Sequence, residues 1–356
     1  MRIVHTADFH LGSVQYNLRA REYDMYKAAE HVFGRAKQLK ADLIILSGDT
    51  FDAIKPPANA VEFLQALITQ TGIEVIGIDG NHDSADNNWL RVCGITPLRN
   101  GSVIERNGIR IGGLNSVRPS LFYPAINEMA ESMKLDIFVM HQAVQELANA
   151  PFAEISAIDM LPAMKQMCVR YVAMGDIHDA NERLISGVEF VYPGSTEMTK
   201  RDEKRNKKFY VVDITPEDLK LTEEPVITRP VVDVMVRTQD DIDNLLVELD
   251  KIPNAMVLIT YDSAVRELGP RLKELMNGRE VLYTITSTAV GKKSVNALKT
   301  EQTFDRKGAF ARQIDAIRVY FEEASDEFRI VKQLLAAPGD VDTVVREYAK
   351  GRGVKL

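Results

Sequence analysis

The chain has 356 residues, of which 45% are hydrophobic and 27% are charged, with a formal net charge of −7, a composition that excludes a wholly disordered chain. Because a single hydrophobic core rarely grows beyond about 250–300 residues, this length predicts two domains and a tail. No apolar run approaches the roughly 20 residues of a membrane span and the N-terminus runs directly into a strand, so we expect no membrane association and a cytoplasmic location.

Residues 1–214 alternate predicted strands with predicted helices. The segment 22–40 has apolar side chains at helical spacing, and 42–47 carries a continuous apolar run that is typical of a strand buried on both faces. The expected strands are 2–6, 42–47, 74–78, 110–114, 137–140, 171–174 and 209–213, and the expected helices are 22–40 and 58–71. This alternation predicts an α/β domain.

Five polar clusters contain the residues best suited to bind metal ions, and four of the six histidines lie in them. The clusters are 8–10, 48–52, 80–83, 140–142 and 175–178, and each comes at the end of a predicted strand. In layered α/β proteins, the groups that contact ligands lie beyond the carboxyl ends of the strands. We therefore expect the five clusters to form one site.

The side chains in these clusters suit a pair of divalent cations. Asp8 and His10 stand two residues apart, so in an extended chain they project to the same side and can bind one ion. Asp49 offers two oxygens that can bridge two ions, and Asn81 adds a neutral oxygen. Mixed Asp, Asn and His ligands suit Mn²⁺, Fe²⁺ or Zn²⁺, and two such ions about 3.5–4 Å apart can stabilise both the attacking and the leaving oxygen of a phosphate ester. The sequence therefore predicts a metal-dependent phosphoesterase.

A second, smaller α/β unit is predicted after a polar boundary at 215–224. It is assigned to 225–290, with expected strands at 231–236, 256–261 and 281–285 and expected helices at 240–249 and 265–276. Because this unit has no ligand cluster, we assign it binding or gating rather than chemistry. A linker at 291–304 leads to a helical region at 305–356.

Two sets of side chains are candidates for contacts with macromolecules. Six basic residues crowd into nine positions: Lys200, Arg201, Lys204, Arg205, Lys207 and Lys208. This basic run predicts either a solvated turn or contacts with a phosphate backbone. The tail has two apolar helix faces, the first with Phe310, Ile314, Ile317 and Phe321 and the second with Phe328 and Leu334. Such helices either pack on a core of their own or dock onto the coiled coil of another protein.

The order of these motifs resembles the calcineurin-like metallophosphoesterases, and more narrowly the SbcD family of DNA repair nucleases. The segments 5–12, 48–52 and 192–197 match that subfamily. The resemblance covers the phosphoesterase domain closely, the small domain in order and size, and the tail in helical pattern only. It implies a two-sheet β-sandwich flanked by helices, with a small α/β capping domain and a C-terminal helical tail.

The resemblance also implies a role for each residue of the site. It places Asp8, His10, Asp49 and His178 on a first metal ion, and Asp49, Asn81, His141 and Asp176 on a second. It makes His82 the histidine that stabilises or protonates the leaving oxygen, with Asp52 holding its ring. The family has a histidine where this chain has Asp176. Aspartate is a competent ligand, so we expect the second metal to be retained; the alternative is a lost second metal and a weak nuclease.

The activity implied by the resemblance is a manganese-dependent exonuclease and endonuclease that acts on double-stranded DNA ends in recombination and repair. The implied partners are an SbcC-type ATPase with a coiled coil, bound by the C-terminal helices, and a second copy of the chain, bound near Trp89 and the helix at 58–71. Two alternatives are a phosphodiesterase for small molecules such as cyclic nucleotides and a catalytically weak scaffold that binds DNA ends. A small substrate requires neither the added domain nor the tail, so we favour the nuclease.

Overall fold

The computed structural model describes residues 1–83, 88–99, 101–148, 153–251, 254–265, 267–277 and 282–288. All helices and strands named below belong to one compact unit. The predicted linker and helical tail lie outside the described residues, and so do the six candidate partner-binding residues Phe310, Ile314, Ile317, Phe321, Phe328 and Leu334. Within the described ranges, no helix has the length and apolar character needed to cross a membrane.

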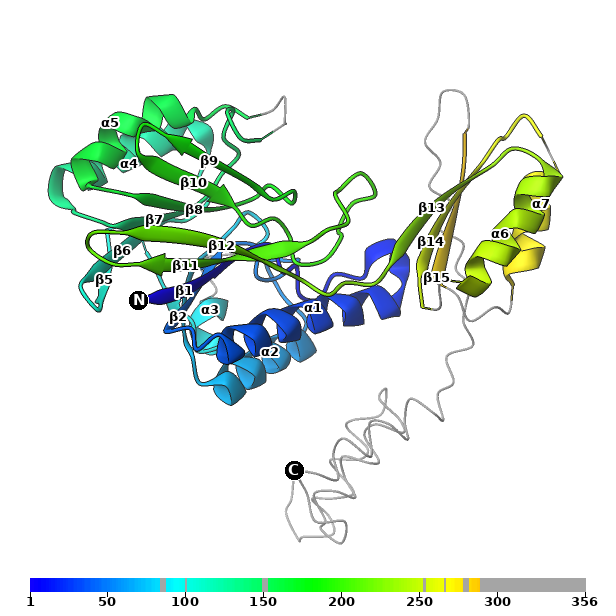
Figure 1. Ribbon diagram of the computed structural model, residues 1–356, viewed down its shortest axis with the longest axis horizontal. Helices are drawn as coiled ribbons and strands as arrows, with labels where there is room; N and C mark the ends of the chain where they lie inside the picture. The colour runs from blue at the N-terminus through cyan, green and yellow to red at the C-terminus, as the bar shows by residue number, and fades with distance from the viewer. Residues whose placement is uncertain are drawn as a thin grey trace, which may run out of the picture. The chain divides into compact units, whose positions relative to one another are not determined.

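Six strands form the first sheet, in the order β12-β11-β1-β2-β3-β4. The parallel strands are β1 (Arg2–Thr6), β2 (Leu43–Ser47), β3 (Glu74–Ile78) and β4 (Thr96–Pro97), and the antiparallel edge is made by β11 (Lys208–Ile214) and β12 (Leu219–Pro225). The short helix η1 (Gln15–Asn17) precedes α1. One face of this sheet is covered by α1 (Arg19–Gln38), α2 (Ala58–Thr71) and α3 (Trp89–Val92) (Figure 1).

The second sheet also has six strands, in the order β5-β6-β7-β8-β10-β9. Its parallel strands are β6 (Ile109–Leu114), β7 (Ile137–His141), β8 (Tyr171–Gly175) and β10 (Val188–Tyr192), flanked by antiparallel β5 (Val103–Arg106) and β9 (Asn181–Ile185). The outer face of this sheet packs against α4 (Pro119–Ser132) and α5 (Ala157–Met167). The helices thus flank both sheets.

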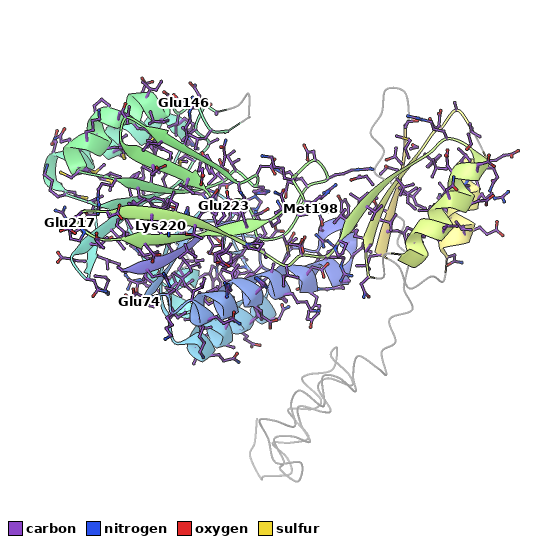
Figure 2. All side chains as sticks on the ribbon, in the orientation of Figure 1. Glu74, Glu146, Met198, Glu217, Lys220 and Glu223 are labelled. Atoms are coloured by element: carbon purple, nitrogen blue, oxygen red, sulfur yellow. The ribbon has the colours of Figure 1, made fainter. Side chains whose placement is uncertain are left out.

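Buried side chains fill the space between the two sheets (Figure 2). In β2, Leu43 and Ile45 face the second sheet, whereas Ile44 packs with the helices on the other side. This alternation is expected because successive side chains of a strand point to opposite faces. Val139 of the second sheet belongs to the same central core as Ile45. The predicted α/β sandwich of two sheets flanked by helices is confirmed.

The smaller α/β part consists of three parallel strands and two helices. The strands are β13 (Val231–Val236), β14 (Met256–Tyr261) and β15 (Leu282–Ser287), in that order across the sheet. The helices α6 (Gln239–Lys251) and α7 (Leu268–Met276) pack on this sheet around a separate hydrophobic core. The elements match the order predicted for this region, while the boundaries of the capping domain stay a prediction.

Several elements depart from the expectations. The polar stretch at 215–224, expected to be a boundary, contains most of β12, which pairs antiparallel with β11. β12 lies at the edge of the sheet and is half-exposed, so its sequence is too polar for a pattern of buried residues to identify it. The helices α4 and α5 and the hairpin of β9 and β10 were also not predicted. Helix α7 begins at Leu268 rather than at 265.

Candidate metal centre

The five polar clusters meet where strands of both sheets end. Three of them follow β1, β2 and β3 of the first sheet, and two come at the ends of β7 and β8 of the second. β2 lies against β7 and β8 across the sandwich, so the carboxyl ends of these strands reach one place. Asp8, Asp49 and His141 are buried there, each at 2% exposure or less. The structure thus brings the five clusters together at one place.

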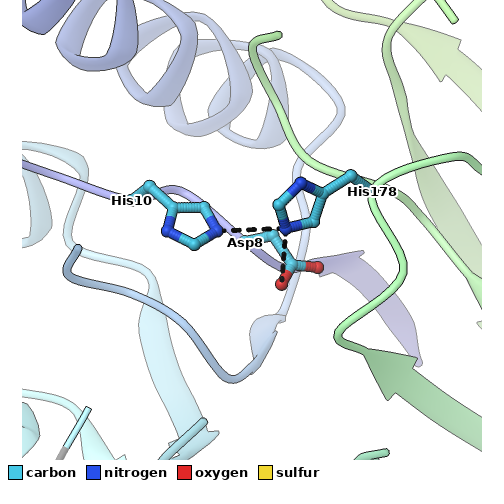
Figure 3. Close-up of side chains that lie close together, drawn as sticks. All are labelled: Asp8, His10 and His178. Atoms are coloured by element: carbon cyan, nitrogen blue, oxygen red, sulfur yellow. Dashed lines mark hydrogen bonds and ion pairs between the residues drawn. The ribbon is translucent and has the colours of Figure 1, made fainter. Parts of the chain in front are cut away.

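His10, His178 and Asp8 bring ligand atoms to one point (Figure 3). The Nε2 atoms of the two histidines lie 3.2 Å apart, and His178 Nε2 lies 4.0 Å from an oxygen of Asp8. Imidazole nitrogens combined with a carboxylate suit first-row transition metals. These three residues could hold one cation.

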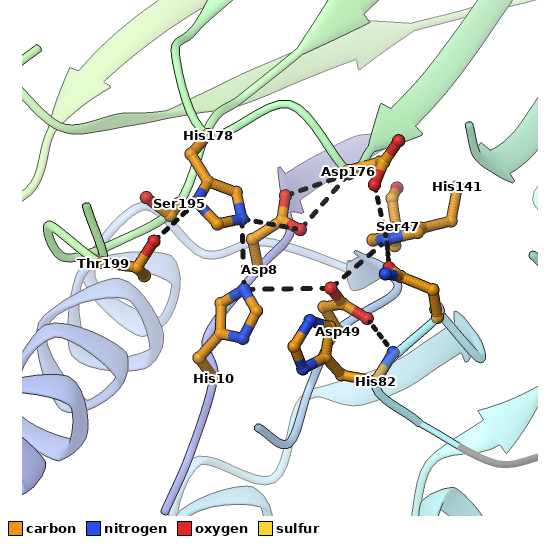
Figure 4. A network of polar contacts seen from close by, with 12 residues as sticks. Asp8, His10, Ser47, Asp49, His82, His141, Asp176, His178, Ser195 and Thr199 are labelled. Carbon is orange, nitrogen blue, oxygen red and sulfur yellow. Dashed lines mark hydrogen bonds and ion pairs between the residues drawn. The ribbon is translucent and has the colours of Figure 1, made fainter. Parts of the chain in front are cut away.

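Asp49 lies between this group and His141 (Figure 4). Its Oδ2 is 3.8 Å from His10 Nε2 and 3.4 Å from His141 Nε2. The side-chain oxygen of Asn81 lies 3.0 Å from the same nitrogen of His141. Asp8, Asp49 and His141 also form a group whose ligand atoms lie within 4.8 Å of one another. One carboxylate thus faces both histidines, so Asp49 could be shared between two cations.

Asp176 lies on the His141 side of the site. Its carboxylate oxygen is 3.8 Å from His141 Nε2, and its backbone N–H donates to the two oxygens of Asp8 at 3.2 and 3.3 Å. Oxygens of Asn81, Asp49 and Asp176 therefore surround one imidazole nitrogen, an arrangement that a bound cation stabilises. These residues could hold the second cation.

In each of the three candidate ligand histidines, the Nδ1 atom, which points away from the site, contacts an oxygen acceptor. The Nδ1–H groups of His10, His141 and His178 donate to the Asp52 carboxylate at 3.1 Å, the Ser47 carbonyl at 2.7 Å and the Glu203 carboxylate at 2.9 Å, respectively. Such contacts fix the tautomer that leaves Nε2 for the metal and fix the plane of the ring. The contributions of Ser47 and Glu203 were not predicted. Glu203 stands inside the basic run, where the sequence gives no reason to connect it with His178.

Two glycines let the ligand loops approach each other closely. A Cβ atom on Gly80 would overlap the carboxylate of Asp49, and one on Gly48 would overlap the ring of His141. Gly48 also has a φ of +92°, which disfavours any residue with a Cβ. The glycines that precede Asp49 and Asn81 are therefore required by the packing of the site itself.

Asp83 ties two of these loops together. Its carboxylate accepts hydrogen bonds from the backbone N–H groups of Thr50, Phe51 and Gly80 at 2.9, 3.0 and 3.2 Å. Burial raises the pKa of Asp83 to about 6, although these donors oppose the shift. Asp83 thereby fixes the loop after β2 against the loop after β3.

His82 is exposed beside the buried ligands, with its ring edge-on to His10 and 5.0 Å from it. The expected contact with Asp52 is made by the backbone carbonyl, which accepts from His82 Nδ1–H at 3.0 Å. The carboxylate of Asp52 is used by His10 instead. The backbone N–H of His82 donates to Asp49 at 2.9 Å, while its ring lies in a group with His10 and Asp52 whose ligand atoms are within 4.8 Å of one another.

The charges of the site are strongly coupled. Burial alone would raise the pKa of Asp49, but the hydrogen bond from His141 and the charges of His141 and His10 hold it well below its ordinary value. Burial alone would lower the pKa of His141, but the hydrogen bond and charge of Asp49, with the charges of Asp8 and Asp176, raise it to about 10. A cation bound at His141 must therefore displace a proton from this ring.

The basic run is divided between internal contacts and solvent. Lys207 is buried at 5% exposure and donates to Glu203 at 2.6 Å. Its ammonium is used inside the protein, so we withdraw Lys207 from the predicted phosphate-binding residues. Arg201 and Arg205 pair with Asp233 of β13 at 2.9 and 2.7 Å, which joins this segment to the smaller sheet.

The other lysines of the run reach the surface. Lys208 is paired with Glu223 of the neighbouring strand β12. Lys200 and Lys204 are exposed and line a pocket of about 290 Å³ together with Asp176 and His178. Two lysines are thus placed beside the candidate metal ligands.

The two-sheet fold with candidate metal ligands at its strand ends is that of a metal-dependent phosphoesterase. The sequence profile of the calcineurin-like phosphoesterase superfamily domain matches residues 1–217. The chain therefore belongs to the calcineurin-like phosphoesterase superfamily, whose members use divalent metals. The family inferred from the motifs is confirmed.

Several relatives bear the name DNA double-strand break repair protein Mre11. The one from Methanosarcina mazei is 30% identical over 242 residues, which cover 64% of this chain and 39% of that protein. The one from Methanosarcina acetivorans is 24% identical over 389 residues, covering 100% and 61%, and the one from Methanocaldococcus jannaschii is 28% identical over 296 residues, covering 76% and 78%. The chain thus spans less than two thirds of the length of the two Methanosarcina relatives.

Proposed function

We propose that this chain is a manganese-dependent nuclease that cleaves phosphodiester bonds of double-stranded DNA, as an exonuclease at ends and as an endonuclease, in recombination and repair. The main support is the convergence of ligand atoms from five strand ends, with Asp49 between His10 and His141. The proposed ligands are Asp8, His10, Asp49 and His178 for one ion, and Asp49, Asn81, His141 and Asp176 for the other. When bound, the two ions supply positive charge next to both the attacking and the leaving oxygen.

His82 is proposed as the general acid for the leaving oxygen. Because its Nδ1–H donates to the Asp52 carbonyl at 3.0 Å, its Nε2 is the atom that would carry the transferred proton. Imidazole is suited to proton transfer near neutral pH. Asp52 contacts both histidines: its carbonyl orients the proposed general acid His82, and its carboxylate orients the proposed metal ligand His10.

DNA is the proposed substrate for two reasons. The three relatives that bear the name DNA double-strand break repair protein match 64%, 100% and 76% of the chain. The exposed Lys200 and Lys204 border the pocket next to His178, where cations can bind a phosphate backbone. The smaller α/β part, joined to the same segment by Arg201 and Arg205, is proposed to cap the groove and to track the duplex.

The ATPase partner is proposed from the resemblance. An SbcC-type ATPase with a coiled coil would bind the predicted C-terminal helices, and its ATP cycle would control access to the site. Deleting the residues after 304 should spare cleavage of short DNA and abolish association with the ATPase, as measured by co-purification. Retained association after this deletion would contradict the proposal.

A homodimer is proposed through α2 and the neighbourhood of Trp89. Ile54 and Val92 leave large apolar surface there, at 53% and 48% exposure, while Trp89 itself packs against the core below and donates to the carbonyl of Ile54. Exposed apolar side chains close to one another favour a protein contact. A monomer in analytical sedimentation at micromolar concentrations would count against the dimer.

The test is cleavage of end-labelled duplex DNA by the metal-free protein after addition of Mn²⁺ or Mg²⁺. We expect cleavage with Mn²⁺, none after chelation, and none with Asp49→Asn, because this variant removes the carboxylate charge between the two histidines. A cyclic nucleotide is assayed in parallel. Hydrolysis of the cyclic nucleotide without DNA cleavage would refute the nuclease and favour a small-molecule phosphodiesterase.

The number of bound ions decides the role of Asp176. Under saturating Mn²⁺ the proposal expects two ions per chain, counted by electron paramagnetic resonance and by elemental analysis. One ion per chain would favour the alternative of a lost second metal and a weak, DNA-binding scaffold.

A further inference from the structure

The segment from Ser195 to Lys207 contains a buried acid and base that neither the metal ligands nor the proposed DNA contacts explain. Glu203 has 9% exposure and Lys207 has 5%, and they form an ion pair of 2.6 Å. A buried ion pair contributes little net stability on its own, because the cost of desolvating both charges offsets their attraction. Because stability alone does not explain this buried ion pair, its contacts with the neighbouring metal site indicate its role.

Both members of this pair contact His178. The ring Nδ1–H of His178 lies 2.9 Å from the carboxylate of Glu203 and 2.6 Å from the hydroxyl of Thr199, which itself donates to that carboxylate. The ammonium of Lys207 donates to the backbone carbonyl of His178 at 3.1 Å. Lys207 also donates to the hydroxyl of Ser195 at 2.8 Å, and the backbone N–H of Ser195 donates to the same carbonyl of His178 at 3.1 Å. The ion pair of Glu203 and Lys207 thus holds both the ring and the backbone carbonyl of His178.

The carboxylate of Glu203 is itself held rigidly. It accepts from the backbone N–H groups of Thr199 and Lys200 at 3.1 and 2.8 Å, and from the Thr199 hydroxyl at 2.5 Å. A carboxylate with this many donors has one orientation, so it can impose that orientation on the imidazole. By comparison, the Asp52 carboxylate that holds His10 is partly exposed, at 38%.

We propose that Glu203, neutralised by Lys207, is a positioning residue for His178, and that it sets the affinity of the first metal position selectively. This inference rests on the proposed two-metal function and adds residues to it. Glu203 does not touch substrate or metal; it fixes the tautomer and the ring plane that present His178 Nε2 toward Asp8 and His10. The second position, around His141, has its own acceptor in the Ser47 carbonyl and does not depend on Glu203.

The experiment compares Mn²⁺ binding to the metal-free wild type and to Glu203→Gln by calorimetric titration. Replacing an outer partner of a metal-bound histidine typically costs about 10–100-fold in affinity, so we expect a loss of this size at one of the two sites and an unchanged second site. The matched control is Asp202→Asn, which removes the same charge from the neighbouring exposed residue. Glu203→Gln with both affinities unchanged, or Asp202→Asn with an equal loss, would overturn the proposal.

A measurement on the wild type keeps the test decisive if Glu203→Gln does not fold. In the Zn²⁺-loaded protein with ¹⁵N-labelled histidine, nuclear magnetic resonance should find His178 protonated at Nδ1 with a slowly exchanging proton. Rapid exchange of that proton, or protonation at Nε2, would overturn the inference. A wild type that binds two ions and cleaves DNA, beside a Glu203→Gln variant with unchanged affinities, refutes only the role of Glu203. A wild type that binds no metal refutes both proposals.

Discussion

His82→Ala should remove most of the cleavage activity while leaving metal affinity unchanged. The side chain of His82 is exposed, makes its hydrogen bond to the Asp52 carbonyl and lies edge-on to the ring of the proposed ligand His10. The contact of this residue with the ligand Asp49 is made by the backbone N–H at 2.9 Å, and alanine retains that group. The substitution therefore separates the chemistry of residue 82 from its part in holding the site.

The expected loss of cleavage rate in His82→Ala follows from the role of a general acid. Proton transfer by a positioned side chain contributes about 10²–10⁴-fold, which is roughly 2.7–5.4 kcal/mol of the activation barrier at 1.36 kcal/mol for each factor of ten. His82 lies near His10 and Asp52 in a group that could itself hold a cation, but it is not one of the proposed ligands. The proposal therefore expects none of this loss to appear in Mn²⁺ binding.

The assay is single-turnover cleavage of end-labelled duplex DNA at saturating Mn²⁺, combined with calorimetric titration of the same preparation. His31→Ala is the matched control, since His31 lies on α1 away from the ligand clusters. Loss of Mn²⁺ binding in His82→Ala would refute the separation of roles. A cleavage rate within tenfold of the wild type would refute the general acid.

Three further predictions concern packing, stability and DNA binding. Gly80→Ala should abolish binding of both Mn²⁺ ions, because the new Cβ overlaps the carboxylate between the two histidines; two ions in a calorimetric titration would contradict this. Arg21→Met should remove the ion-pair partner of the buried carboxylate of Glu197 and leave it only backbone N–H donors. We expect this to cost about 3–5 kcal/mol, which lowers Tm by about 6–20 °C in scanning calorimetry. Adding Glu197→Gln should restore part of the lost stability, and an unchanged Tm in Arg21→Met alone would contradict this prediction. Lys204→Ala should weaken duplex binding and reduce the salt dependence of binding by about one ion, whereas Lys220→Ala on β12 should not; equal slopes in fluorescence anisotropy would contradict the phosphate contact.

The local patterns were sufficient to place the strands that carry the site. The apolar runs at β1, β2, β3, β7 and β8 predicted these strands to within one or two residues. The polar residues at their ends were therefore expected together, and the ligand atoms of Asp8, Asp49 and His141 do lie within 4.8 Å of one another. Edge elements were harder to predict, because a half-exposed strand such as β12 does not show a run of buried side chains.

The supporting contacts could not be predicted, since they join residues that are distant in sequence and ordinary in type. Ser47 holds His141 through a backbone carbonyl, which any residue at that position could supply. Lys207 was grouped with the DNA-binding lysines by charge alone, but the fold turns it inward to Glu203. Composition cannot separate a solvated lysine from a buried one, because only the neighbouring side chains determine where its charge is neutralised.

The order and spacing of the polar clusters therefore determined which residues could bind cations, because parallel strands in a layered α/β fold bring their carboxyl ends to one edge. The tertiary structure alone decided which oxygen holds each histidine, how Asp49 lies between His10 and His141, and which cations of the basic run reach solvent. The physical reason is that hydrogen-bond direction and burial depend on contacts between distant segments, and a local sequence pattern does not contain those distances.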